Sequence, residues 1–237
     1  MAKYLPLFVV LLAGVFAGAG MTVGKTSWAG RQKKAAAEKE PFDEARLFFE
    51  FNSTDNDLGV QLFLDGEAWK QLSLIAPNGR KILDIRVQGR LGQLGLTELF
   101  WESDEPSPEE VLELIQEGEY KFVGRTIEGD VLQSKAELSH ELPPAPTIEV
   151  PSAPGDTLDP DNAIIRWAEI PGIESIEVIV ENEDVGAEML VPLSADATSL
   201  HVPREFLDPE TEYKVEVIAI GENGNKTISE REFVTGS

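Results

Sequence analysis

The chain has 237 residues, no cysteine and a formal charge of −23, from 43 acidic and 20 basic residues. This length allows one or two domains, and without disulfides each domain must be held by core packing alone. So many carboxylates repel phosphate backbones, which excludes nucleic acid as an expected partner. The part from Pro143 onward has 20 acidic and 5 basic residues, a balance that favours solubility or attraction of a basic partner.

Residues 1–19 have the pattern of an export signal. Lys3 gives a positive start, Leu5 to Phe16 is an apolar run, and Ala17-Gly-Ala19 fits a cleavage site. A membrane anchor is the alternative, because no charge occurs from Tyr4 to Gly24 and these 21 residues can span a bilayer. Export predicts a secreted, periplasmic or cell-surface protein, and the lack of cysteine in an exported chain suggests a bacterial source. A membrane is a partner only if the segment stays uncleaved.

Residues 20–45 are polar and rich in alanine, with no apolar periodicity, and we expect a tether. A basic cluster within it lies on the wrong side for an anchor that leaves the following domains outside. It comprises Lys25, Arg31, Lys33 and Lys34. An anchor oriented by that cluster would not export the domains.

Residues 46–142 predict a β-sandwich module with one short helix. We expect its strands around Phe49, at Val60–Leu64 with an end at Asp65-Gly66, at Trp69–Ile75, Lys81–Val87, Leu96–Glu102 and Glu119–Gly124, and at Leu132–Leu138. Asn78-Gly79 suits a hairpin turn with positive φ at both residues, and Gly89–Gly95 a bulged or flexible connection. Ser107-Pro108-Glu-Glu is typical of a helix start, which predicts a helix over Pro108–Gln116.

Residues 143–237 predict a second sandwich, after the proline-rich boundary Leu142–Pro146, which should limit rotation between the modules. We expect seven strands, at 147–150, 163–167, 175–181, 188–193, 199–202, 213–220 and 227–235. Leu207 and Pro209 precede a strand that begins at Tyr213 and alternates strictly, which indicates a tyrosine corner. Leu114 and Tyr120 stand in the same order in the first module, so both modules are expected to use this corner.

Residues 144–237 resemble a fibronectin type III module. The resemblance rests on Pro144 and Pro146 at the entry, Trp167 on the second strand, the run Leu207-x-Pro209-x-Thr211-x-Tyr213, and Phe233-x-Thr235 at the exit. It implies a spacer or binding module rather than an enzyme. The first module resembles the broader immunoglobulin-like sandwich more loosely.

Motifs for catalysis and cofactors are missing from the sequence, so we expect a non-enzyme without cofactors. Asp55 and Asp57, in the cluster Asn52–Gly59, are weak candidates for calcium ligands, but the loop lacks the full spacing of a calcium hand. An Asx-rich turn is the alternative, and we predict no metal site. Asn225-Lys-Thr227 matches the pattern for N-glycosylation, which has meaning only in a eukaryote.

Three functions remain open. The first is a non-catalytic interaction or adhesion protein, whose first module binds an unidentified protein or glycan while the second serves as a spacer. The second is a purely structural envelope spacer, and the third a carbohydrate-binding accessory module. Leu99 and Trp101 project from one face of an expected strand. Either the helix Pro108–Gln116 covers them, or they form a docking patch.

Overall fold

The computed structural model describes residues 39–237. The expected export signal at residues 1–19 and most of the expected tether at residues 20–45 lie outside the described residues. The described residues all belong to one compact unit. Within them, no helix is long and apolar enough to cross a bilayer.

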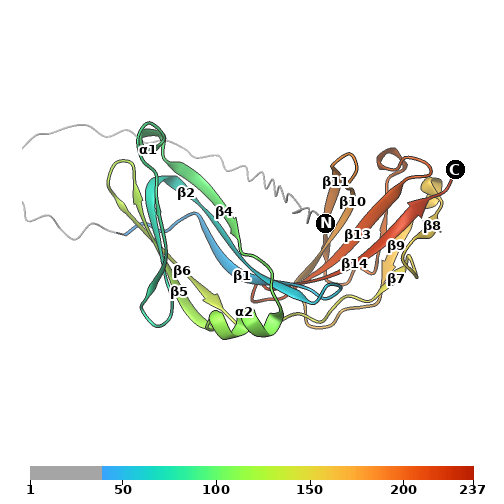
Figure 1. Cartoon of the computed structure of the whole chain (residues 1–237), viewed down its shortest axis with the longest axis horizontal. Helices are drawn as coiled ribbons and strands as arrows, with labels where there is room; N and C mark the ends of the chain where they lie inside the picture. Colours follow the sequence, from blue (N-terminus) through green and yellow to red (C-terminus); the bar gives the residue numbers. More distant parts are fainter. Residues whose placement is uncertain (1–38) are drawn as a thin grey trace, which may run out of the picture. The chain divides into compact units, whose positions relative to one another are not determined.

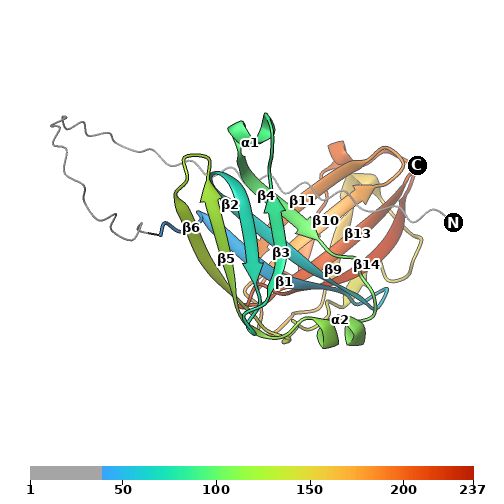
Figure 2. The ribbon, with the colours of Figure 1, turned by 60° about the vertical axis from the view of Figure 1, so that its left-hand side comes forward.

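The first module is built from antiparallel strands with short helices between them (Figures 1 and 2). Its elements are β1 Glu44–Asn52, β2 Asp57–Ile75, β3 Lys81–Arg86, α1 Leu91–Leu94, β4 Leu96–Glu102, α2 Pro108–Leu114, β5 Gly118–Thr126 and β6 Val131–Leu138. Strand β2 pairs with β1, β3, β4 and β5, and β5 also pairs with β6.

Strand β2 is long because its two halves have different partners. The half before Asp65 pairs with β1 and most of β4, and the half from Trp69 pairs with β3 and β5. The register shifts between these halves, so the chain bends through a bulge where the sequence predicted a strand end. A Cβ at Gly66 would lie 3.1 Å from the Phe42 ring, so a side chain at this bend would press against that ring.

Two local predictions in this module were wrong in detail. Only Gly79 of the Asn78-Gly79 pair has positive φ (80°), because the turn is closed by the Gly79 N–H donating to the Ala76 carbonyl, 2.9 Å away. The glycine-rich stretch at 89–95 forms the helical turn α1 rather than an irregular connection. A Cβ at Gly92 would lie 2.7 Å from the Val87 carbonyl oxygen, which explains why residue 92 is a glycine.

The second module is a two-sheet sandwich. Its elements are β7 Ile148–Val150, β8 Asp156–Leu158, η1 Pro160–Asn162, β9 Ile164–Trp167, β10 Ser175–Asn182, β11 Ala187–Ser194, β12 Ser199–His201, η2 Arg204–Phe206, β13 Glu212–Ile220 and β14 Lys226–Thr235. One sheet has the order β12-β9-β7, and the other the order β11-β10-β13-β14. Each of the seven expected strands is present, and the short β8 pairs with β14 in addition.

Each module has its own hydrophobic core. The first core contains Phe49, Trp69 and Phe122, which are fully buried. The second core is built around Trp167 and Phe233, with Tyr213 stacked on Phe233 at 5.6 Å between ring centroids. Buried residues of one core do not recur in the other.

The Tyr213 hydroxyl links β13 to the chain before it. It accepts the Asp208 N–H at 2.8 Å and donates to the Phe206 carbonyl at 3.2 Å, and Leu207 between them is buried. These are the bonds that a tyrosine corner makes to the backbone a few residues upstream.

The corresponding pair in the first module is only partly similar. The Tyr120 hydroxyl donates to the Gln116 carbonyl at 2.7 Å, four residues upstream. Leu114, however, is 77% exposed, so it does not occupy the position of Leu207. The reason is that α2 turns Val111 into the core and Leu114 away from it.

The two modules share a continuous sheet. Strands β1 and β14 run parallel, with Glu50 opposite Lys226 and Asn52 opposite Ile228, so β1 extends the larger sheet of the second module. Asn225, which is fully buried, donates to the Ser139 and Glu141 carbonyls at 2.7 and 2.8 Å. Contacts across the boundary therefore include backbone pairing as well as the proline-rich connection.

Candidate functional site

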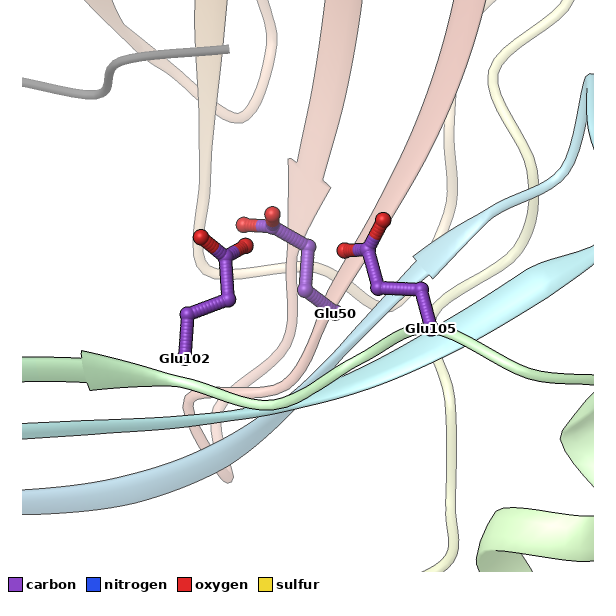
Figure 3. Close-up of side chains that lie close together, drawn as sticks. All are labelled: Glu50, Glu102 and Glu105. Carbon is purple, nitrogen blue, oxygen red and sulfur yellow. The ribbon is translucent and has the colours of Figure 1, made fainter. Parts of the chain in front are cut away.

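Three carboxylates gather on the first module close to its junction with the second. Glu50 comes from β1, Glu102 from the end of β4 and Glu105 from the segment after β4, and their side chains point toward one another (Figure 3). Ligand atoms of all three lie within 4.8 Å of one another. We call these residues the carboxylate triad.

Strand alternation explains why Glu50 lies in this position. Phe49 and Phe51 face the first core, so Glu50 between them faces the opposite side of the sheet, where it is 6% exposed. Gln61 lies on the neighbouring strand β2 and is also buried. Its side-chain amide donates to Glu50 at 2.5 Å and to Glu102 at 3.1 Å, so both amide hydrogens bind triad oxygens.

Glu105 is an exposed residue, yet its carboxylate turns inward. A Cβ on Gly59 would lie 3.0 Å from the Glu105 Oε1 and 3.1 Å from its Cγ. The missing side chain of Gly59 therefore provides the space that Glu105 occupies, a common role of glycine inside a strand.

The second module supplies positive charge to the triad. The Lys226 ammonium on β14 lies 3.9 Å from Glu50 Oε2, and closer, at 3.1 Å, to Glu177 on β10. It also lies over the Phe48 ring at 5.6 Å from the centroid. Glu50 and Lys226 thus connect the two modules electrostatically, although Glu177 holds the ammonium more closely.

The triad favours bound protons near neutral pH. Burial raises the pKa of Glu50 to about 7, against the opposing effect of Lys226 and with a further increase from Glu102. Burial also raises the pKa of Glu105 to about 7, and neighbouring carboxylates, Asp57 first among them, raise it further. Burial raises the pKa of Glu102 as well. The three groups titrate as one coupled set.

As a cation site the triad is incomplete. Its carboxylates are oxygen ligands of the kind that calcium takes, but calcium takes six to eight of them. We therefore assign no metal to it. Of the two calcium candidates from the sequence, Asp57 raises the pKa of Glu105 and Asp55 raises that of Glu230 in the second module, and neither belongs to the group of three carboxylates that the described residues bring together.

A second acidic cluster surrounds Lys214 on β13. Its ammonium lies 2.7 Å from Glu181 and 3.0 Å from Glu216, with Glu230 at 3.8 Å. Burial alone would lower the pKa of Lys214, but these carboxylates raise it above its usual value. Burial raises the pKa of Glu216 to about 7. In this cluster one ammonium lies among several carboxylates of the second module, and the buried Glu216 Oε2 has no hydrogen-bond partner among the described residues.

Leu99 and Trp101, the expected patch on β4, differ in their exposure. Leu99 packs partly against the first core, whereas Trp101 is 41% exposed. Helix α2 buries Val111 in the core and does not cover Trp101, so that expectation is not met for the indole. Phe100, on the opposite face, is 40% exposed.

No protein-family model matches the chain, and no curated protein sequence does. Solved structures with similar folds include the FN1–FN3 domains of chicken CNTN1, at 14% identity and a TM-score of 0.33, over 84% of this chain and 67% of that one. A two-domain fibronectin type III segment of chicken tenascin has 12% identity and a TM-score of 0.31, over 84% and 100%. An Fn3-like protein from Clostridium thermocellum has 21% identity and a TM-score of 0.30, over 40% and 93%.

The strand order of the second module decides its fold. The sequence resemblance predicts a sandwich of seven short strands, and the structure places these strands in a three-stranded sheet β12-β9-β7 and in a sheet β11-β10-β13-β14. The second module has the fold of a fibronectin type III sandwich. In this second module, β14 is the strand that contacts the first module, through its parallel pairing with β1.

Sequence patterns gave no signal for the triad. Its members are separated by 52 and by 3 positions, counted from Glu50 to Glu102 and on to Glu105, in a chain with many other acids. The one local sign is Glu50 between two phenylalanines of an alternating strand, which places a carboxylate on a sheet face beside large apolar residues.

Proposed function

We propose that this chain is an exported, non-catalytic interaction protein whose first module binds a partner and whose fibronectin type III module is a spacer. The observation that carries the binding role is Trp101, which is 41% exposed on β4. Strand β4 pairs with β2, and no other pairing of β4 occurs within the described residues. Exposed tryptophans are frequent binding hot spots, and open strand edges accept an added strand.

The spacer role is supported by the junction between the modules. A flexible linker would let the first module rotate freely, whereas the β1–β14 pairing adds backbone hydrogen bonds across the boundary. Thr227 on β14 donates to the Pro143 carbonyl at 2.8 Å, which ties the proline-rich connection to the same strand. A spacer of this kind presents its binding module in a fixed orientation.

Export remains part of the proposal. It rests on the pattern of residues 1–19, with a secreted, periplasmic or cell-surface location in a bacterium as the expected outcome. Fractionation of the producing cells, together with the N-terminal sequence of the mature protein, tests it. A mature chain that starts after Ala19 supports export with cleavage, and an intact chain in the cytoplasm contradicts it.

A binding comparison tests the main role. Wild-type protein, Trp101→Ala and the control Val185→Ala are applied to peptide and glycan arrays, because Val185 is 73% exposed on the second module. We expect a wild-type peptide ligand whose binding falls at least tenfold in Trp101→Ala only, with unchanged melting temperatures. Binding restricted to glycans would instead indicate the carbohydrate-binding alternative. Absence of any ligand would favour the structural spacer.

A further inference from the structure

The segment Ser103–Ser107 connects β4 to α2 and lies along the edge of β2. The Ser103 N–H donates to the Val60 carbonyl at 3.0 Å, and the Ser103 Oγ accepts the Val60 N–H at 2.9 Å. Near its other end, the Pro106 carbonyl accepts the Leu58 N–H at 3.0 Å. Few bonds therefore hold this segment, which we call the strap, against β2.

The strap places a negative charge where other negative charges already lie. Glu105 is exposed and has solvent available, yet its carboxylate lies over Gly59 beside Glu50 and Glu102. If all three carboxylates were ionised, their repulsion would push Glu105 outward. This repulsion is strong because Glu50 is buried, where water screens its charge only weakly.

Other charged groups around the triad strengthen this repulsion more than they relieve it. Asp57 on β2 and Asp104 on the strap are both negative and act on Glu105. From the second module, Lys226 on β14 attracts Glu50, but Glu177 on β10 binds the same ammonium more closely. A proton held among the three carboxylates removes one charge and lets an acid donate to a carboxylate.

We propose that the carboxylate triad closes the strap onto β2 when it holds a proton and releases the strap when it is fully ionised. Release turns Glu105 into solvent and leaves the ionised Glu50 beside Lys226. It also frees the Leu58 and Val60 N–H groups at the edge of β2, on the same side as β4. The device requires no partner, so it stands or falls separately from the binding role of Trp101.

An NMR titration of the full chain between pH 5 and 9, in the presence of EDTA, tests the proposal. The amide signals of Gly59, Val60, Ser103 and Glu105 should shift together, with a common midpoint near the pKa of about 7 that burial gives Glu50 and Glu105. In Glu105→Gln, a change on an exposed residue that should not affect folding, the strap amides of Ser103 and residue 105 should no longer shift, while Glu50 still titrates. Glu98→Gln is the control, because Glu98 is exposed on the same strand β4 and outside the triad.

Amide hydrogen exchange supplies the second measurement. After correction for the intrinsic effect of pH, protection of the Leu58 and Val60 amides should fall at least tenfold between pH 6 and 8 in the wild-type protein. The same amides should keep their protection in Glu105→Gln. Strap amides that show no midpoint between pH 5 and 9, or protection that falls equally in Glu105→Gln, would overturn the proposal.

Discussion

The side-chain oxygen of Asn225 accepts the backbone N–H of Phe49 at 2.8 Å, although the two residues are 176 positions apart. The amide nitrogen of the same side chain donates to two carbonyls at the end of the first module, those of Ser139 and Glu141. One fully buried asparagine thus satisfies three backbone groups of the first module from the last hairpin of the second. Backbone groups buried without partners are costly, so this residue should stabilise the junction.

Asn225→Ala should destabilise the protein by about 3 kcal/mol, because the three backbone groups lose their partner in a buried place. Urea denaturation measures the change. Asn223→Ala is the matched control, since Asn223 lies in the same hairpin, is exposed, and makes one bond across the boundary, to the Glu141 carbonyl. Equal losses in the free energy of unfolding for the two substitutions would show that the burial of Asn225 does not add to stability.

Tyr213→Phe should leave the fold intact and lower the free energy of unfolding by about 1 to 3 kcal/mol, because the Asp208 N–H and the Phe206 carbonyl lose the hydroxyl. Tyr120→Phe is a useful comparison, since its hydroxyl makes one backbone bond, to the Gln116 carbonyl. We expect a smaller loss there. A denaturation midpoint that does not change in Tyr213→Phe, at constant slope, would mean that the corner has no stabilising role.

The fragment of residues 143–237 should fold by itself and melt cooperatively. It retains its own core and both of its sheets, and loses the contacts with the first module, among them the pairing of β14 with β1 and the hydrogen bonds of Asn225. Its melting temperature should be lower than that of the same module in the whole chain. Calorimetry measures both values, and an unfolded fragment would show that the domain boundary at residue 143 is wrong.

Stability should be highest at mildly acidic pH and fall as the pH rises toward 8. The pKa values of Glu50 and Glu216 are raised by burial to about 7, so the folded state binds their protons more tightly than the unfolded state does. The stabilisation is complete below the ordinary value of about 4.5 and is lost as the pH passes through 7. Each group contributes at most about 3.5 kcal/mol, at about 1.4 kcal/mol per pKa unit.

Glu50→Gln and Glu216→Gln each remove one titrating group and should flatten this pH profile. Glu98→Gln changes an exposed carboxylate of β4 and should leave the profile unchanged. The profile comes from urea denaturation at a series of pH values between 5 and 8. A wild-type stability that increases with pH over this range would contradict the burial argument.

The sequence predicted most strands of both modules, because alternation of apolar residues is a local property. The strand that begins at Tyr213 is the clearest case, since its inward residues Val215, Val217 and Ala219 are all fully buried. Strand β2 was predicted as two strands, because Asp65-Gly66 has the composition of a turn. What continues the strand is its change of partners, which no local pattern records.

The junction and the triad could not be predicted for a related reason. Parallel pairing of Glu50 with Lys226 joins residues far apart in the sequence, and only the folded modules bring them together. Asn225 fits the pattern for N-glycosylation, yet in the structure its amide is buried and bonded to the first module. Glu105 in turn depends on the space left by Gly59, a contact that neither residue signals alone.

Strands β1 and β14 and the side chain of Asn225 connect the two modules, and we infer that these contacts hold the modules in a fixed relation. Measurement of ¹⁵N relaxation on the full chain tests it most directly, because it reports how each module tumbles. We predict one rotational diffusion tensor for amides of both modules in the wild-type protein, and separate, faster tumbling of the modules in Asn225→Ala. Separate tumbling of the two modules in the wild-type protein would contradict the claim.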